Sequence, residues 1–416
     1  MNTVPVAVLI GIDTGSNQSI SADDSLCELV DLSITAGIQV SSILIQKRTS
    51  ADNRSYLGKG KLDELRLRIE ASSATLIVTD DELTPTQYRF LESFFSLKVI
   101  DRTGLILDIF AQRAFTHEAK LQVELAQLTY LYPRLTRLWT HLSRLGGGGV
   151  GTRGPGEKQL EVDKRLIRKR IVALKKDIKA VALHRNRHRH SRKRLPLLTG
   201  ALIGYTNAGK STLFNALTGA SVLEEDRLFA TLDPTTRTIS FPHKADILLT
   251  DTVGFIQKLP HHLVDAFKAT MEEIIVADFL IHVVDSSNPN IDHVINTSTS
   301  VLSDIGFTPK PTLYVFNKKD LVNSSFDVCS QYTPYCFVSA LNLSDISDLK
   351  ETIASFITQF ETIMSFSIPY SRSDILNKLY KFGSIISKNY GDVIHVTASI
   401  NPIIGSKLLS ELYEKN

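Results

Sequence analysis

Cysteine is scarce in this sequence of 416 residues, and long apolar runs are missing. The three cysteines form no CxxC pair and have no histidines at metal-ligand spacing, which argues against a disulfide framework and a zinc site. No apolar run approaches the roughly 18 residues that cross a membrane. The first run ends at Asp13 and follows no basic segment, so it is typical of a buried strand rather than a secretion signal. We expect a soluble, cytoplasmic protein without integral membrane contact.

Low-complexity segments are also missing. Hydrophobic residues make up 43% of the chain and charged residues 22%, which is typical of globular proteins. A chain of this length exceeds one compact core, so we expect two to four folded domains joined by short linkers.

Charge is unevenly distributed along the chain. The formal net charge is only +3, but residues 164–194 contain fourteen lysines and arginines and one acid, Asp177. His184, His188 and His190 alternate with arginines whose charge would repel a metal cation. A basic segment on an otherwise acidic chain indicates a partner with phosphate groups, either nucleic acid or a membrane surface touched peripherally. The alternative is a helix face that is merely solvated.

The first 112 residues alternate short β-rich runs with helical patterns. Strands are predicted at 6–10, 43–46, 76–79 and 99–100, and helices at 25–36, 61–71 and 84–95. This alternation is typical of a parallel sheet covered by helices. Residues 1–112 are therefore predicted to form an α/β domain.

Residues 113–194 have a helical period. Apolar residues recur at spacings of three and four in 121–145 and again in 160–181, which predicts an antiparallel helical hairpin. Its tip, 146–156, is rich in glycine, whose conformational freedom costs stability. We interpret the tip as an RNA-contacting surface, against the alternative of a plain turn. The RNA-contact candidates are Gly147, Gly148, Gly149, Arg153 and Gly154 at the tip, with Arg185, Arg187 and Arg189 in the basic run.

A phosphate-binding motif follows the basic run. The apolar strand 197–203 leads into GYTNAGKS at 204–211 and then a helix, which is GxxxxGKS in its strand–loop–helix context. Backbone N–H groups of such a loop wrap the phosphates at a helix N-terminus. Lys210 is expected to reach the β and γ oxygens, and Ser211 to ligate Mg²⁺.

Two further elements are expected at the γ-phosphate. The DxxG motif at 251–254 follows a second apolar strand, and we expect Asp251 to hold Mg²⁺ through water while the Gly254 amide meets the γ-phosphate. Residues 229–237, FATLDPTTR, are expected to be switch I, in which a threonine adds a hydroxyl to Mg²⁺. Thr231, Thr235 and Thr236 compete for that role.

The base-reading motif selects guanine. NKKD at 317–320 ends a third apolar strand, and Asp320 can accept hydrogen bonds from N1–H and the exocyclic amine of guanine. Adenine offers no such donor pair, so the carboxylate favours GTP over ATP. Lys318 would cover the purine, and Asn317 would tie this loop to the phosphate loop. Ser339 and Ala340 end another strand and would offer backbone N–H to the guanine O6.

A complete guanine-nucleotide site is thus predicted, with GTP or GDP and Mg²⁺ as its ligands. The expected GTP-binding residues are Gly204, Tyr205, Thr206, Asn207, Ala208, Gly209, Lys210, Ser211, Thr212, Phe229, Ala230, Thr231, Leu232, Asp233, Asp251, Thr252, Val253, Gly254, Asn317, Lys318, Asp320, Ser339 and Ala340.

Catalytic strength is expected to be low. In Ras-type enzymes a glutamine after the DxxG glycine orients the attacking water. Phe255 stands there in this chain and cannot do so. We predict slow intrinsic GTP hydrolysis, supported at the γ-phosphate only by Lys210 and the switch I threonine, and stimulated by a macromolecular partner.

GGGGVGTRGPGE, GYTNAGKST, FATLDPTTR, DTVGF and NKKD, in this order, resemble the pattern of the HflX family of ribosome-associated GTPases, within the Obg-HflX superfamily and the TRAFAC class. The resemblance covers nearly the whole chain and places the switch I ligand at Thr231. It also extends to Phe255, because the family replaces the catalytic glutamine.

The resemblance implies a multidomain α/β fold. Its parts would be the N-terminal α/β domain at 1–112, the helical hairpin at 113–194, a Ras-like G domain at 195–363 with a mostly parallel sheet between helices, and a small βαβα domain at 364–416.

The resemblance also implies a function. The protein would bind the large ribosomal subunit as a monomer, near the peptidyl-transferase centre and not on DNA, and its GTP state would split or rescue stalled ribosomes. The alternatives are a regulatory switch for a protein effector and an NTP-dependent factor that remodels ribosomal RNA.

Overall fold

The computed structural model describes residues 4–15, 21–135, 156–192, 197–220, 228–241, 244–258, 271–304, 306–322 and 331–413. The chain forms two compact units. The first is Met1–His184 with Arg227–Asp233 and Gln257–Ala269, and the second is Arg185–Asp226 with Pro234–Ile256 and Thr270–Asn416. Among the helices in the described ranges, none is both long and apolar enough to cross a membrane.

The N-terminal domain is built on a four-stranded parallel sheet with the strand order β2-β1-β3-β4. Buried aliphatic residues of β1 and β3 form its centre, and the half-exposed β2 is an edge strand. The predicted parallel sheet is confirmed. In chain order the elements are β1 (Val6–Asp13), α1 (Ala22–Thr35), β2 (Gln39–Lys47), α2 (Lys59–Ser72), β3 (Leu76–Thr79), α3 (Pro85–Phe95), β4 (Lys98–Asp101) and α4 (Arg102–Arg113).

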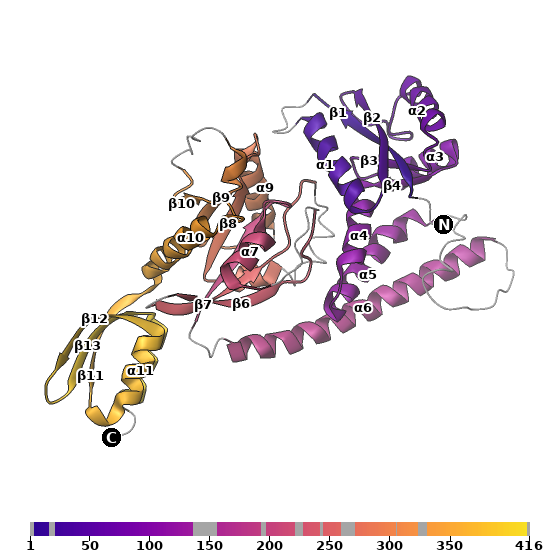
Figure 1. The fold of residues 1–416 in the computed structure, drawn as a ribbon. Coiled ribbons are helices and arrows are strands. Elements are labelled where there is room, and N and C mark those ends of the chain that lie inside the picture. The colour runs from indigo at the N-terminus through magenta and orange to yellow at the C-terminus, as the bar shows by residue number, and fades with distance from the viewer. Residues whose placement is uncertain are drawn as a thin grey trace. The chain divides into compact units, whose positions relative to one another are not determined.

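Two long helices follow, and the second of them belongs to the first unit up to His184. They are α5 (His117–Leu131), which ends in the short helix η1 (Tyr132–Arg134), and α6 (Gly156–Arg192). Ile167 and Leu174 of α6 are buried, and Arg170 forms a bidentate ion pair with Glu124 of α5 at 2.7 Å. The two helices therefore lie side by side (Figure 1). Residues 146–155 of the glycine-rich tip lie outside the described residues, as do the side chains of the three candidate RNA-contact arginines in α6.

The G domain contains a six-stranded sheet with the order β10-β9-β8-β5-β7-β6. All neighbours are parallel except β6 and β7, which confirms a mostly parallel sheet. Its elements are β5 (Leu198–Gly204), α7 (Lys210–Thr218), β6 (Thr235–Phe241), β7 (Lys244–Asp251), β8 (Phe279–Asp285), α9 (Ile291–Asp304), β9 (Thr312–Asn317), η3 (Lys319–Leu321), β10 (Tyr335–Phe337), α10 (Leu343–Phe356) and η4 (Ile357–Phe360).

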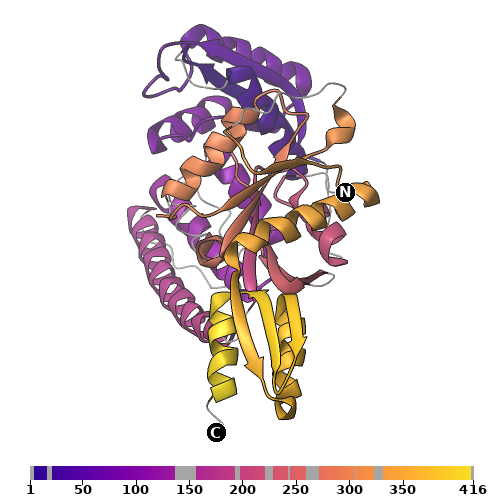
Figure 2. The same ribbon diagram turned by 90° about the vertical axis from the view of Figure 1, so that its left-hand side faces the viewer.

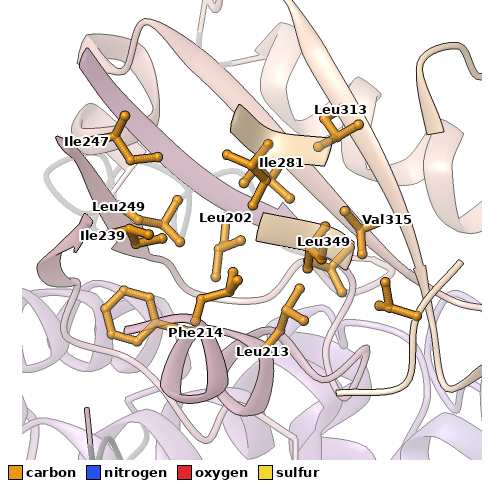
Figure 3. Close-up of a cluster of buried hydrophobic side chains, with 14 of the residues drawn as sticks. Leu202, Leu213, Phe214, Ile239, Ile247, Leu249, Ile281, Leu313, Val315 and Leu349 are labelled. Atoms are coloured by element: carbon orange, nitrogen blue, oxygen red, sulfur yellow. The ribbon is translucent and has the colours of Figure 1, made fainter. Parts of the chain in front are cut away.

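The core of the G domain explains why its central strands are apolar along their length. Figure 3 shows Leu202 and Ile281 of the sheet facing Leu213 and Phe214 of α7. A second cluster, which includes Ala201 and Ile203, covers the opposite face of the same strands. Strands buried on both faces carry continuous apolar runs, and their carboxyl ends are left to hold a site.

The C-terminal domain is a three-stranded antiparallel sheet in the order β11-β13-β12 with two helices packed on it (Figure 2). It consists of β11 (Thr362–Ile368), the short helix η5 (Tyr370–Arg372), α11 (Ser373–Phe382), β12 (Gly383–Tyr390), β13 (Ile394–Ile400) and α12 (Pro402–Tyr413). The predicted βαβα order is wrong, because the domain is βαββα. The missed strand, β12, has only Gly383 fully buried and a bulge at Ile385/Ser387, so its sequence lacks an alternating apolar pattern.

Candidate guanine-nucleotide site

The phosphate loop joins β5 to α7 at the carboxyl edge of the sheet, and its shape requires glycine at two positions. Gly204 has φ 143°, and a Cβ there would meet the Val283 carbonyl oxygen at 2.1 Å. Gly209 has φ 85°, and a Cβ there would meet Asn317 Nδ2 at 2.3 Å. The glycine positions of the motif are therefore set by close backbone approach as well as by backbone angle.

Lys210 begins α7, and its side chain is buried in the loop that precedes it. Its Nζ donates a hydrogen bond of 2.7 Å to the Tyr205 carbonyl oxygen. Burial lowers the pKa of Lys210 to about 8, although the Asp251 carboxylate acts in the opposite direction. Burial and the nearby Lys210 charge also lower the pKa of His282 on β8 to about 3, so this histidine is neutral at pH 7.

The predicted metal ligands Ser211 and Asp251 are brought together. The Ser211 hydroxyl donates to Asp251 Oδ2 at 2.8 Å, and Asp251 ends β7 with no exposed surface. A hydroxyl beside a carboxylate is the hard oxygen donor set that Mg²⁺ prefers, so these residues fit the ion. The Thr252 hydroxyl instead donates to the Leu202 carbonyl oxygen at 2.5 Å. Its side chain is thus engaged in holding β7 to β5.

The DxxG turn lies directly on the phosphate loop. A Cβ at Gly254 would meet Lys210 Nζ at 2.8 Å and Thr206 Cα at 2.9 Å. The Phe255 N–H donates to the Gly204 carbonyl oxygen at 3.0 Å, and its own carbonyl oxygen accepts from the Thr206 N–H at 2.8 Å. The Phe255 ring is fully buried in the cluster that includes Met271. Position 255 is therefore a core position in this chain.

Asn317 connects the phosphate loop to both base-reading loops. Its Nδ2 donates to the Ala208 carbonyl oxygen at 2.9 Å, and its Oδ1 accepts from the Ala340 N–H at 3.0 Å. The predicted tie between the loops is confirmed. Because one amide makes both contacts, Asn317 aligns the phosphate loop with the base-reading loops.

The two charged residues of the base-reading motif have different surroundings. Asp320 is exposed and has no hydrogen-bond or ion partner among the described residues. Lys318 adopts φ 62° and its Nζ lies 2.8 Å from Asp285 Oδ2, at the end of β8. Asp320 is thus available to a ligand, whereas Lys318 is already oriented by a neighbouring carboxylate.

The sequence did not reveal the role of Asp345, whose side chain holds the guanine-reading loop in place. Its Oδ2 accepts from the Ser339 N–H at 2.7 Å, and its Oδ1 pairs with Lys319 Nζ at 2.6 Å. Burial acts to raise the pKa of Asp345, but the contacts with Lys319 and Ser339 prevail and lower it. The available signal was an aspartate in the first turn of the helix that follows the Ser339–Ala340 pair, a helix capped by Asn342.

The segment Arg227–Asp233, which contains residues 229–233 of the predicted switch I, belongs to the first unit. The Asp233 carboxylate accepts from the Thr116 N–H at 3.0 Å and from the Thr116 hydroxyl at 2.6 Å, at the N-cap of α5. The Phe229 ring packs edge-to-face on Phe110 with centroids 4.6 Å apart. Thr231 is 8% exposed within this segment.

The segment after the DxxG turn, Gln257–Ala269, also belongs to the first unit. Lys258 Nζ lies 2.5 Å from Asp80 Oδ2 and 2.7 Å from Asp81 Oδ1, at the carboxyl end of β3. Burial acts to lower the pKa of Lys258, but the two carboxylates prevail and raise it. Arg102 and Ser25 also bond to Asp80. Lys258 is therefore part of a charged network in the N-terminal domain.

The sheet, the phosphate loop, the DxxG turn and the guanine loops together define a P-loop GTPase. A family model described as a 50S ribosome-binding GTPase matches residues 199–318. Models described as the N-terminal part and the middle region of a GTP-binding GTPase match residues 23–111 and 113–192.

The chain belongs to the HflX family of GTPases. It is 46% identical to GTPase HflX of Caldanaerobacter subterraneus over 93% of this chain and 90% of the relative. It is 47% identical to GTPase HflX of Escherichia coli over 72% of this chain and 70% of the relative. It is also similar to the crystal structure of SsGBP in complex with GDP, at 25% identity and a TM-score of 0.49, covering 85% of this chain and 99% of the other. As a member of the HflX family with a GTPase domain, the protein is a GTP hydrolase.

Proposed function

We propose that this GTPase binds the large ribosomal subunit in its GTP state, splits or rescues stalled ribosomes, and is released when the ribosome stimulates hydrolysis. The observation that carries the proposal is the burial of Phe255 in a G domain whose family model is described as ribosome-binding. A side chain held in the core cannot orient water at the γ-phosphate. The missing group would therefore come from the partner.

The nucleotide would be held as the motifs indicate. Lys210 and the Gly254 amide would meet the γ-phosphate, and Asp320 would pair with the guanine edge. Ser211, Asp251 and Thr231 would hold Mg²⁺, directly or through water, and the ion would neutralise the developing phosphate charge. Asn317 keeps the phosphate and base loops in register for both ends of the nucleotide.

The hairpin would supply the ribosomal RNA contact. Helix α6 carries the basic segment, and the glycine-rich tip precedes it. Arginine and lysine on a helix bind the phosphate backbone, and bare glycine backbone can approach a base closely. We propose that this arm reaches toward the peptidyl-transferase centre of the ribosome. The protein would act in the cytoplasm.

The test combines binding with splitting. Intact ribosomes are incubated with the protein and GTP, GDP or a non-hydrolysable GTP analogue, and sedimented through a gradient. We expect subunits to separate with GTP and with the analogue, and the protein to stay on the large subunit only with the analogue. Equal binding with GDP, or failure to bind in any state, would contradict the proposal.

Two matched variants sharpen this test. Asp320→Asn should abolish GTP-driven splitting, whereas Asp348→Asn, at an exposed position on α10, should leave it unchanged. Splitting that persists in Asp320→Asn would show that the activity does not use this nucleotide site. RNA remodelling without subunit separation would favour the alternative of an rRNA-remodelling factor.

A further inference from the structure

Three of the four exposed tyrosines in the C-terminal domain are linked to one another by contacts. Tyr370, Tyr380 and Tyr390 are 57%, 54% and 66% exposed, although they come from three different elements. Phe366 of the same domain is 1% exposed. Large aromatic rings normally bury most of their surface, so several exposed rings in one place indicate a contact surface.

Lys388 brings two of these rings together. Its Nζ lies 4.6 Å from the centroid of the Tyr390 ring and donates to the Tyr380 hydroxyl at 3.4 Å. The Tyr370 hydroxyl donates to the carbonyl oxygen of Gly391, the residue next to Tyr390, at 3.0 Å. We name Tyr370, Tyr380, Lys388 and Tyr390 the tyrosine–lysine patch.

The bulge in β12 creates this arrangement. Ile385 pairs with Ala398, whose side chain is buried beneath the helices. A regular strand would then turn position 388 to the opposite face, because side chains alternate with a period of two. The bulge at Ile385/Ser387 shifts the register by one residue, so Lys388 pairs with the buried Val396 and faces α11. The same shift brings Tyr390 to this side.

The charge of the patch is not neutralised. No carboxylate forms an ion pair with Lys388 among the residues that the structure describes, and hydrogen bonding to Tyr390 and Tyr380 raises its pKa. Residues 364–416 carry six lysines and arginines against four acids. An unpaired ammonium between exposed rings suits a ligand that is both flat and anionic, which describes an unpaired nucleotide better than a protein side chain.

We propose that the tyrosine–lysine patch binds unpaired bases of RNA, with the tyrosine rings stacking on bases and Lys388 contacting phosphate. The inference rests on the proposed function for its source of RNA, the ribosome. The patch would be the second RNA-binding surface of the protein, located in the C-terminal domain and additional to the helical hairpin. Stacking on aromatic rings is tolerant of sequence, so the patch should recognise single-stranded RNA in general.

The direct test measures RNA binding by the full chain. Fluorescence anisotropy with an unstructured oligoribonucleotide is compared for the wild type, Tyr390→Ala, Tyr390→Phe and Lys388→Ala. Tyr390→Ala should weaken binding about tenfold, the usual effect of losing one stacked base, whereas Tyr390→Phe should retain it. Lys388→Ala should weaken binding and flatten its salt dependence. Tyr413→Ala is the matched control, because Tyr413 is 68% exposed in the same domain and stacks on no cation among the residues up to 413 that the structure describes.

A second readout locates the contact. Photo-crosslinks from 4-thiouridine in the same oligoribonucleotide should map to 370–390 in the wild type and disappear in Tyr390→Ala. Unchanged affinity in Tyr390→Ala, or crosslinks that map elsewhere, would overturn the inference. Equal thermal unfolding of the variants and the wild type would show that the fold is intact.

Sedimentation with large subunits separates this inference from the proposed function. If the wild type binds subunits and Tyr390→Ala binds RNA and subunits equally well, only the inference fails. If the wild type does not bind subunits, the proposed function fails. Binding of the oligoribonucleotide then still tests whether the patch binds RNA. If Tyr390→Ala loses subunit binding but keeps RNA binding, the patch contacts ribosomal protein, and the RNA assignment is wrong.

Discussion

The loops predicted to read the nucleotide and the segments predicted to respond to its γ-phosphate are held by different parts of the chain. Asn317 joins the phosphate loop to the guanine loop within the G domain. The predicted switch I and the segment after the DxxG turn take their partners from the first unit, where Asp233 bonds to Thr116 and Lys258 pairs with Asp80. We propose that the first group decides which nucleotide binds and that the second changes conformation when it binds.

The largest expected effect is on base selection. Asp320→Asn replaces one acceptor oxygen with a donor that would face guanine N1–H, so GTP affinity should fall by at least about 100-fold. ATP affinity should not fall. Calorimetric titration with both nucleotides measures this, and Asp348→Asn is the matched control. A parallel loss for GTP and ATP would mean that Asp320 acts on the loop and not on the base.

A methyl group at Gly254 should disturb the contact between the DxxG turn and the phosphate loop. Gly254→Ala would push a Cβ into Lys210 Nζ and Thr206 Cα, and the backbone atom cannot move aside. We expect GTP turnover to fall at least about tenfold, which corresponds to a barrier higher by roughly 1.4 kcal/mol, with a smaller effect on GDP affinity. Gly60→Ala, where a Cβ meets nothing within 4 Å, should leave turnover unchanged. Normal turnover in Gly254→Ala would show that the turn does not approach the phosphate loop in solution.

The pKa of Lys210 should appear in nucleotide binding. Burial lowers it to about 8 in the free protein, and bound phosphates would favour the charged ammonium and raise it again. Binding should therefore be strongest below pH 8 and weaken as the pH rises above 8, by up to about tenfold per pH unit. The dissociation constant of GDP is measured from pH 7 to pH 9.5, with guanosine as the phosphate-free control. A flat GDP profile would contradict a lowered pKa.

The smallest expected effect tests the switch contacts. Asp233→Ala removes the acceptor of the Thr116 hydroxyl and amide, while Thr116 still caps α5 through the Ala119 N–H. Losing such exposed hydrogen bonds costs about 1 kcal/mol. If the contact restrains switch I, intrinsic turnover should rise about fivefold. Single-turnover hydrolysis measures this, with Asp304→Ala as an exposed control. Unchanged turnover would mean that the contact does not restrain the switch.

The nucleotide-binding loops could be predicted well from the sequence because their chemistry depends on residues that are close together along the chain. Gly204, Gly209 and Asn317 occupy positions whose backbone geometry follows from a strand–loop–helix context, and the structure confirms their contacts. Asp345 was not predicted, because its function depends on two loops that meet only in the folded domain.

Long-range contacts and weakly patterned strands were beyond sequence reasoning. The bond from Asp233 to Thr116 joins positions 117 residues apart, and no local motif marks either residue for it. Strand β12 is half-exposed and bulged, so its sequence shows neither an alternating apolar pattern nor a continuous buried run. The missed strand is the one that carries Lys388 and Tyr390.

The most direct measurement of the central claim is steady-state GTP turnover with and without purified large ribosomal subunits. We expect slow hydrolysis by the free protein, because the buried Phe255 stands where Ras-type enzymes have the glutamine that orients water, and at least about tenfold faster hydrolysis when subunits are present. Asp320→Asn should abolish both rates. Turnover that is equally fast without subunits, or equally slow with them, would contradict a GTPase whose catalytic site is completed by the ribosome.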